Sequence, residues 1–321
     1  MNLAHFPAHA PLAVQTRGLL VESVHYGSLA ALDPNGSTVL TRGEPGARIY
    51  PRSALKPLFA VAMVRAGLEL PADQLALAAA SHSGSADHQD LAAKILAEAG
   101  LEAAALRNST DLPYGTAERH AWIQVGNGPT RLAQNCSGKH AAMLATCVLN
   151  GWDTETYLHH DHPLPTLIRA VVAELTGEDV TITSTDGCGT EVFALSLTGM
   201  ARAFSRLVTA AEGTAERRVA EAMRAHPLMV AGTGRDVTAL MEAVPGLLAK
   251  DGFEGIQLIA LPDGSALALK ISDGSDRARM PAAVPALLAL GLAPGPLEPF
   301  NNLPVLGGGH PVGTLSGLPF G

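Results

Sequence analysis

Ser53 and Lys56 are the two side chains in this sequence whose spacing best suits covalent catalysis. They lie three positions apart at what looks like a helix start, and residues at i and i+3 share one helix face. A serine hydroxyl becomes a good nucleophile when a neighbouring base takes its proton, and a neutral lysine amine is such a base. The alternative is an N-cap serine beside a solvated lysine, since both residue types are common. The pair predicts acyl transfer only if other motifs support it.

Two further polar segments could complete such a site. Ser81-His82-Ser83-Gly84 interrupts an apolar run and could project hydroxyl groups into a cleft, although a loop that caps the next helix would look the same. Lys250-Asp251-Gly252 stands before a predicted strand, where penicillin-recognising enzymes carry lysine-threonine-glycine. Aspartate replaces the threonine here, and a surface turn explains this segment equally well.

The three cysteines suggest a different chemistry. An odd number of cysteines in a chain that looks cytosolic indicates metal-binding, reactive or buried thiols rather than a disulfide framework. Cys136 and Lys139 stand at a helix start, which would lower the thiol pKa, and Cys188 lies between two glycines. Two thiolates could hold zinc, but a usual zinc site needs more ligands. Two unrelated buried cysteines, or Cys136 acting as a nucleophile with His140, are the alternatives.

Composition limits the class of protein. Of 321 residues, 47% are hydrophobic and 16% are charged, which predicts a large buried core. The net charge is −8 without a basic block, so we expect no nucleic-acid partner. No apolar run is long enough to cross a bilayer, and residues 1–11 lack the pattern of a signal peptide. We therefore expect a cytoplasmic protein without a membrane partner.

The order of elements predicts an α+β fold. Strand patterns cover 12–24, a hairpin around Asp33-Pro34-Asn35-Gly36, and two runs at 255–261 and 266–271. Helical patterns cover 58–66, 87–99, 141–150, 165–175, 191–206, 213–225 and 277–290. Residues 107–130 and the tail from 293 look irregular. An antiparallel sheet built from N- and C-terminal strands, with a helical middle lobe, satisfies this order.

These patterns make residues 1–321 a single enzyme unit of two packed lobes. The sheet lobe is predicted over 12–50 and 250–292, and the mainly helical lobe over 51–249. We expect a site between the lobes.

Taken together, the motifs resemble one enzyme family. The chain is similar to the type 3 (Rhizobium etli-type) L-asparaginases of the asparaginase II family. The resemblance lies in seven ordered segments: 21–28, 52–57, 81–84, 135–140, 186–189, 226–233 and 268–274. It implies a serine β-lactamase- and glutaminase-like fold, usually a homodimer, and hydrolysis of L-asparagine to L-aspartate and ammonia.

The resemblance also implies roles for individual residues. Ser53 with Lys56 forms one catalytic serine–lysine tandem, and Ser81 with Lys250 forms the second. Ser83 is an alternative second serine, and Lys270 is an alternative second lysine. A zinc ion with a tuning role would bind Cys136, Lys139 and Cys188. The remaining implied substrate contacts are Arg52, Ser83, Asp186, Gly187 and Thr233.

Two other functions fit the same residues. One is a different amidohydrolase of the same fold, such as a glutaminase. The other is a non-catalytic amino-acid-binding protein, which would bind its ligand without turning it over.

Overall fold

The computed structural model describes residues 6–320, which fall into two compact units that we describe separately. Unit 1 holds the residues up to Ala54, Leu195–Val208 and the chain from Leu240 onward, and unit 2 holds Leu55–Ala194 and Thr209–Ala239. Residues 1–5, which begin the segment predicted to lack a signal peptide, lie outside the described part. Among residues 6–320, no helix combines the length and the apolar character that a membrane crossing requires.

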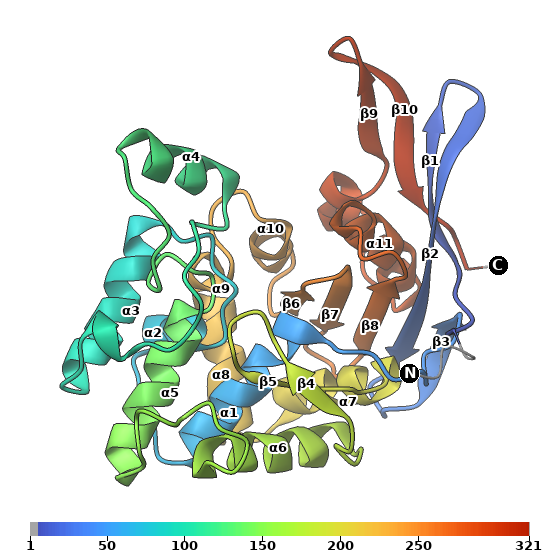
Figure 1. The fold of residues 1–321 in the computed structure, drawn as a ribbon. Helices are drawn as coiled ribbons and strands as arrows, with labels where there is room; N and C mark the ends of the chain where they lie inside the picture. The colour runs from blue at the N-terminus through green and yellow to red at the C-terminus, as the bar shows by residue number, and fades with distance from the viewer. Residues whose placement is uncertain (1–5, 321) are drawn as a thin grey trace. The chain divides into compact units, whose positions relative to one another are not determined.

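Unit 1 is an antiparallel sheet that joins the two ends of the chain (Figure 1). Within the described residues its eight strands follow the order β6-β7-β8-β2-β1-β10-β9, with β3 also paired to β2. The strands are β1 (Ala10–Arg17), β2 (Leu20–Leu32), β3 (Thr38–Arg42), β6 (Leu248–Gly252), β7 (Ile256–Ala260), β8 (Ala266–Ile271), β9 (Leu303–Gly307) and β10 (His310–Gly317). This order confirms the predicted α+β class and the pairing of N- and C-terminal strands.

The centre of this sheet is buried on both faces. The second half of β2 and all of β7 are buried, as expected for near-continuous apolar strands. Helix α11 (Arg279–Ala289) packs on β1, β7, β8 and β10 and follows the short turn η3 (Asp276–Ala278). The other helical segments of unit 1 are α7 (Leu197–Thr209) and η4 (Gly295–Phe300).

Two strand predictions for unit 1 were wrong. The predicted strand 12–24 is a hairpin, because Gly18 adopts a φ of 55° and reverses the chain between β1 and β2. The tail, predicted to be loop, forms the hairpin β9–β10. Its strands are stabilised by a partner distant in sequence, because β10 pairs with β1, placing Val14 opposite Ser316. Such non-local pairing leaves little signal in a Pro- and Gly-rich tail.

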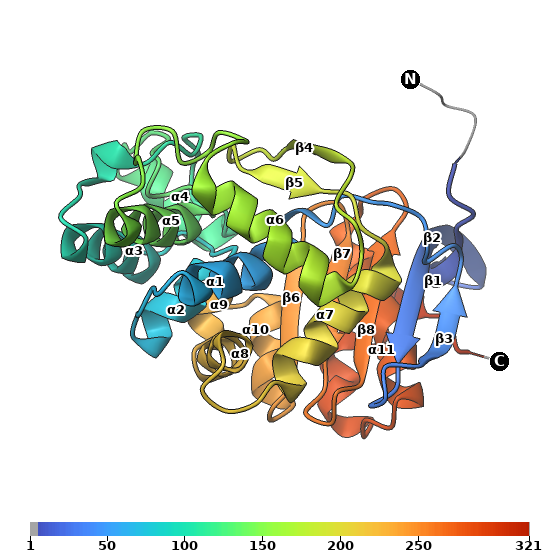
Figure 2. The same ribbon diagram turned by 90° about the horizontal axis from the view of Figure 1, so that it is seen from below.

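Unit 2 is mainly helical, with one two-stranded ribbon (Figure 2). Its elements are α1 (Lys56–Arg65), α2 (Ala72–Ala78), α3 (Ala86–Glu98), η2 (Ala103–Ala105), α4 (Thr116–Gln124), α5 (Ser137–Asn150), α6 (Pro163–Thr176), β4 (Thr183–Thr185), β5 (Glu191–Phe193), α8 (Ala215–Ala225), α9 (Pro227–Val230) and the start of α10 (Asp236–Ala243). Helix α1 is central: it contacts α5, α6 and α8, and nine of its ten residues are buried.

Local signals explain where the helices of unit 2 begin and end. Ser85 caps α3 and forms a capping box with His88. Gly151 and Gly177 end α5 and α6 in the left-handed conformation. Helix α4 was not predicted, and it lies in the segment 107–130 that looked irregular. It buries no residue fully, so its sequence lacks a clear apolar stripe.

Candidate active site

Lys56 is the most enclosed cation near the candidate serines of unit 2. Its side chain is 2% exposed at the first position of α1. The Nζ atom donates hydrogen bonds to the carbonyl oxygen of Ala80 at 2.6 Å, to the Ser81 hydroxyl at 3.0 Å and to the carbonyl oxygen of Asn135 at 3.4 Å. A lysine with these partners is fixed in position, and its amine lies within proton-transfer reach of a serine hydroxyl.

Ser81 is held in place by the backbone around it. It follows α2, and its N–H donates to the carbonyl oxygen of Val230 at 3.0 Å. The next residue, His82, donates its N–H to the carbonyl oxygen of Asn135 at 3.2 Å. Ser81 is therefore clamped between two segments that are distant in sequence, so its hydroxyl has a defined direction toward Lys56.

Ser83 uses its hydroxyl inside the protein. It is 1% exposed, and its Oγ donates to the carbonyl oxygen of Ala231 at 2.9 Å, while its own N–H donates to the same oxygen at 2.7 Å. Its carbonyl oxygen accepts from the N–H of Gly115 at 2.9 Å. These bonds lock the loop that carries Ser81. The role of Ser83 as a substrate contact stays a prediction.

His82 belongs to this loop and is completely buried. Its Nε2 is 2.9 Å from the Ser137 hydroxyl, and its ring stacks on His88 with centroids 4.9 Å apart. Burial, followed by the nearby charges of His88 and Lys56, holds the pKa of His82 well below its usual value. The imidazole is therefore neutral in the folded protein at neutral pH.

This burial predicts a loss of stability in mild acid. As the pH falls below about 6.5, unfolded chains bind a proton at His82 that the folded protein does not, so the free energy of unfolding falls. Between about pH 7.5 and about pH 5.5 the wild type should lose on the order of 1 kcal/mol more than a His82→Gln variant, as measured by urea unfolding. Equal losses in the two proteins would contradict this role of His82.

A second cluster in unit 2 contains the two predicted thiol ligands. Cys136 precedes α5, and Lys139 lies in the first turn of that helix. The Lys139 Nζ donates to the Cys188 sulfur at 3.2 Å and to the Thr190 hydroxyl at 2.8 Å. Both cysteines and the lysine are buried, so the structure brings together the three residues proposed from the sequence.

The pKa values of the two cysteines and the lysine in this cluster depend on one another. The hydrogen bond with Cys136 and the charge of Lys139 hold the pKa of Cys188 well below its usual value. The same hydrogen bond, together with burial, raises the pKa of Cys136 well above its usual value. Burial opposes the charge on Lys139, but the two sulfurs outweigh it and raise the pKa of the lysine. The charge of Lys139 and the hydrogen bond between the two thiol groups thus both favour the thiolate form of Cys188 over that of Cys136.

His140 borders this cluster and is also fully buried. Its Nδ1 is 2.7 Å from the Tyr157 hydroxyl, whose oxygen accepts from the N–H of Arg107. Among the described residues its Nε2 has no hydrogen-bond partner. Burial, with the charge of Lys139, lowers the pKa of His140 to about 4, so the ring is neutral.

The remaining predicted contacts of unit 2 lie in loops. Asp186 and Gly187 form the turn before Cys188: the Asp186 N–H donates to the carbonyl oxygen of Thr190 at 2.8 Å, and the Gly187 carbonyl accepts from Ser109. Thr233 is exposed in the loop after α9. Their contacts with substrate stay predictions.

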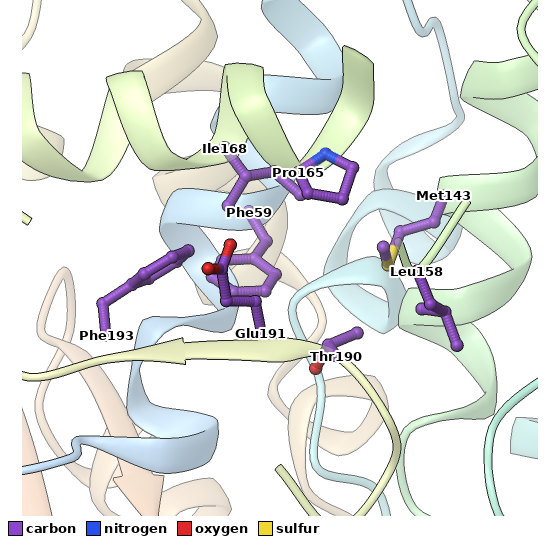
Figure 3. Close-up of a pocket in the computed structure, with 8 residues that line it drawn as sticks. All are labelled: Phe59, Met143, Leu158, Pro165, Ile168, Thr190, Glu191 and Phe193. Carbon is purple, nitrogen blue, oxygen red and sulfur yellow. The ribbon is translucent and has the colours of Figure 1, made fainter. Parts of the chain in front are cut away.

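A small cavity adjoins the cysteine cluster, and Figure 3 shows its lining. Eight residues from α1, α5, the loop between α5 and α6, α6 and the β4–β5 region surround it: Phe59, Met143, Leu158, Pro165, Ile168, Thr190, Glu191 and Phe193. Lys139 lies beside it, with its Nζ 5.5 Å from the centre of the Phe59 ring. The cavity is mostly apolar and too small for an amino acid, so we assign it to packing.

Two candidate residues belong to the end of the N-terminal segment of unit 1. Ser53 is buried in the turn η1 (Arg52–Leu55), which leads directly into α1. Arg52 adopts a φ of 53°, which is rare for a residue other than glycine, and its guanidinium lies 5.3 Å from the centre of the Phe253 ring. Backbone strain of this kind clusters at functional sites.

The two candidate second lysines also belong to unit 1. Lys250 precedes the strand predicted at 255–261, which is β7, but it lies on a strand itself, β6, and its buried Nζ pairs with the Asp251 carboxylate at 2.5 Å. Lys270 lies on β8, where its Nζ donates to the carbonyl oxygens of Glu254 and Ile271. Burial lowers the pKa of Lys270. The tandem of Ser81 with Lys250 joins residues of different units and stays a prediction.

Solved structures with some likeness to the chain are hydrolases. A β-lactamase from Mycobacterium bovis aligns with a TM-score of 0.42 and 15% identity, covering 78% of this chain and 88% of that one. A putative β-lactamase from Bacteroides dorei DSM 17855 aligns at 0.44 and 13%, covering 80% and 92%. EstCE1, a hydrolase with promiscuous acyltransferase activity, aligns at 0.41 and 13%, covering 78% and 90%.

The sequence comparison is more decisive than these structural likenesses. Comparison with curated proteins finds no match. The model of the L-asparaginase II family, however, matches residues 13–316. This span covers nearly the whole chain and includes both the Lys56–Ser81 pair and the cysteine cluster. The protein is therefore an amidohydrolase that belongs to the L-asparaginase II family.

Proposed function

We propose that this protein hydrolyses L-asparagine to L-aspartate and ammonia through a serine acyl-enzyme. The observation that carries the proposal is the buried contact of 3.0 Å between the Lys56 amine and the Ser81 hydroxyl. A hydroxyl and a base at this distance, in a member of the L-asparaginase II family, are suited to amide hydrolysis. Within the family, we assign the chain to the type 3, Rhizobium etli-type enzymes on its seven motifs.

Ser53 is the acylated residue in this proposal. Its chain position, three residues before Lys56 and directly after the strained Arg52, supports that choice. Lys56, acting as the base, takes the proton from Ser53 as the hydroxyl oxygen bonds to the side-chain carbonyl carbon of asparagine. Backbone N–H groups at the start of the helix stabilise the oxyanion. The carbon–nitrogen bond then breaks.

Ser81 moves protons in this scheme. Because its hydroxyl is bonded to Lys56, it can pass a proton from the lysine to the leaving nitrogen, so that ammonia departs. A water molecule then attacks the acyl carbon and gives its proton to Lys56. Aspartate leaves, and Ser53 recovers its proton. Lys250 is proposed as the second lysine, with Lys270 as the alternative.

The cysteine cluster fits zinc in its donor types. Two sulfurs and one amine are soft or borderline donors, and the His140 ring at the edge of the cluster interacts with the Cys188 sulfur. Among residues 6–320 no three His, Cys, Asp or Glu side chains converge, so the amine of Lys139 is required as a ligand. We propose that Cys136, Lys139 and Cys188 hold zinc. Bound there, the ion would supply positive charge that tunes substrate binding. A homodimer and a cytoplasmic location stay predictions.

Ammonia release from L-asparagine and L-glutamine, measured side by side with and without added zinc, tests this function. We expect release from asparagine at a kcat/KM at least about tenfold above that for glutamine, and about one zinc per chain by metal analysis. Preference for glutamine would make the protein a glutaminase. Thermal stabilisation by asparagine without any release would make it a binding protein. Unchanged activity in chelated, zinc-free protein would contradict the proposed role of zinc in substrate binding.

A further inference from the structure

His82 directly follows Ser81 and is bound to the residues on both sides of Cys136, the first ligand of the proposed metal site. Its backbone N–H donates to the carbonyl oxygen of Asn135 at 3.2 Å, and its Nε2 is 2.9 Å from the hydroxyl oxygen of Ser137. All five residues belong to unit 2. One histidine thus joins the loop that carries Ser81, at two points, to the segment that carries Cys136.

Asn135 contacts both the serine–lysine pair and the cysteine cluster. Its carbonyl oxygen accepts from the Lys56 Nζ at 3.4 Å as well as from the backbone of His82. Its side-chain Oδ1 lies 3.3 Å from the Cys136 sulfur and accepts from the Gln134 amide at 3.1 Å. The Cys136 N–H donates to the side-chain oxygen of Gln134 at 3.0 Å. Asn135 therefore touches a proposed metal ligand through its side chain and the proposed base through its backbone.

The bond to Ser137 explains why a histidine occupies this buried position. The Nδ1 atom of His82 has no partner among the described residues, so we assign the ring proton to Nε2, which donates to the Ser137 hydroxyl. A buried ring with one unsatisfied nitrogen costs stability that an apolar side chain would not. The ring stacks on His88, which is itself held by the Ser85 hydroxyl and the carbonyl oxygen of Leu228. The direction of Nε2 is therefore fixed.

We propose that His82 is a positioning residue that holds Ser81 against Lys56 and makes their contact depend on the state of the cysteine cluster. This inference rests on the proposed asparaginase function and deepens it. Ser81 can pass a proton only while its hydroxyl stays at hydrogen-bond distance from the lysine amine. A shift of Cys136 would move its two neighbours in the chain, and both of them hold His82. Occupancy of the cluster would thereby change kcat, in addition to the substrate binding already proposed.

A pair of substitutions with equal side-chain length tests the positioning role. Glutamine at position 82 can donate to Ser137, whereas methionine cannot. His82→Met should lower kcat for L-asparagine about 10- to 100-fold and change KM less than about threefold, because proton transfer is misaligned while substrate contacts remain. His82→Gln should keep kcat within about threefold of the wild type. Equal kcat values in the two variants would overturn the inference.

Ser137→Ala removes the same hydrogen bond from its other side. It should lower kcat as much as His82→Met does, and the double variant should lose no more than either single variant, because the two changes act on one bond. Independent, multiplying losses would show that His82 and Ser137 do not act together. Urea unfolding of each variant verifies that the assayed protein is folded.

Zinc affinity, measured by competition with a chromogenic chelator, tests the link to the cluster without any turnover. His82→Met should weaken zinc binding about tenfold, because residues that support a metal ligand contribute about this much to metal affinity, and His82→Gln should stay within about twofold of the wild type. The matched control is His162→Met. His162 is also buried in unit 2, and its Nε2 is 3.0 Å from the carbonyl oxygen of Asp153. This variant loses a comparable hydrogen bond but should keep zinc affinity and kcat within about twofold.

The outcomes separate this inference from the proposed function. Equal zinc affinities in the wild type and His82→Met, or a wild type that binds no zinc, would refute the dependence on the cluster. If His82→Met weakens zinc binding but the wild type releases no ammonia from asparagine, the proposed function fails and the link between position 82 and the cluster stands. If the wild type releases ammonia and His82→Met does so equally fast, the function stands and the inference is wrong.

Discussion

Replacing Lys56 by methionine lowers kcat/KM for L-asparagine by at least about 10³-fold, because the proposed reaction loses the group that moves its protons. Methionine keeps the length and packing of the lysine stem but cannot accept a proton. Lys56→Arg should be as inactive, because a guanidinium stays charged and cannot serve as the base. This second variant separates loss of the base from loss of positive charge. Ammonia release from both variants is measured at saturating and at limiting asparagine.

The control for this experiment is a lysine of the same unit in a different environment. Lys94 has a side chain that is 59% exposed and lies 3.9 Å from Glu98, so Lys94→Met should change activity less than twofold and stability by less than about 0.5 kcal/mol. Lys56→Met itself leaves the carbonyl oxygens of Ala80 and Asn135 without this donor. Urea unfolding therefore has to accompany the assay. A folded Lys56→Met protein that keeps a tenth of the activity would refute the role of Lys56 as the base.

Replacing Gly138 by alanine destabilises the protein by roughly 1–2 kcal/mol. Gly138 lies in the first turn of α5, and a Cβ atom there would lie 2.4 Å from the Cγ and 2.8 Å from the carbonyl oxygen of Leu77 on α2. Overpacking of this kind costs about 1–3 kcal/mol, and the better helix propensity of alanine returns up to about 1 kcal/mol. The two helices have to separate, and Ser81 follows one of them while Lys139 lies on the other. Activity should therefore fall together with stability.

Gly128 provides the matched substitution. No atom lies within 4 Å of the position of its Cβ atom, and its φ lies outside the left-handed region, so Gly128→Ala should stay within about 0.5 kcal/mol of the wild type. Urea unfolding of both variants gives the comparison. If Gly138→Ala is as stable as Gly128→Ala, the close approach of α2 and α5 does not constrain the site in the way described.

Local patterns in the sequence were enough to find most of the helices. Apolar runs that end at a glycine predicted α3, α5 and α6 to within a few residues, because Gly151 and Gly177 adopt the conformation that ends a helix. The hairpins β1–β2 and β9–β10 were not predicted. They are joined by the pairing of β1 with β10, two strands at opposite ends of the chain. Such pairing has no local signature, and the turn at Gly18 lies inside a continuous run of strand-forming residues.

The residues of the candidate site also differ in whether a local motif in the sequence predicts them. Motifs close in sequence predicted the pairs Ser53 with Lys56 and Cys136 with Lys139; the second pair lies in one buried cluster, and the first stays a prediction. The contact of Lys56 with Ser81 spans 25 positions and was not anticipated, since each serine had been assigned a different lysine. Two of the three described hydrogen-bond partners of Lys56 are backbone carbonyl oxygens, which any residue could supply.

The most direct test of the central claim is to locate the acyl group. The protein is mixed with L-asparagine, quenched in acid within milliseconds to seconds, digested and analysed by mass spectrometry. We predict one aspartyl adduct on the peptide that contains Ser53, absent from Ser53→Ala and from unreacted protein, with ammonia release abolished in that variant. An adduct on Ser81 or Cys136, or full activity in Ser53→Ala with none in Ser81→Ala, would contradict the proposed acyl-enzyme.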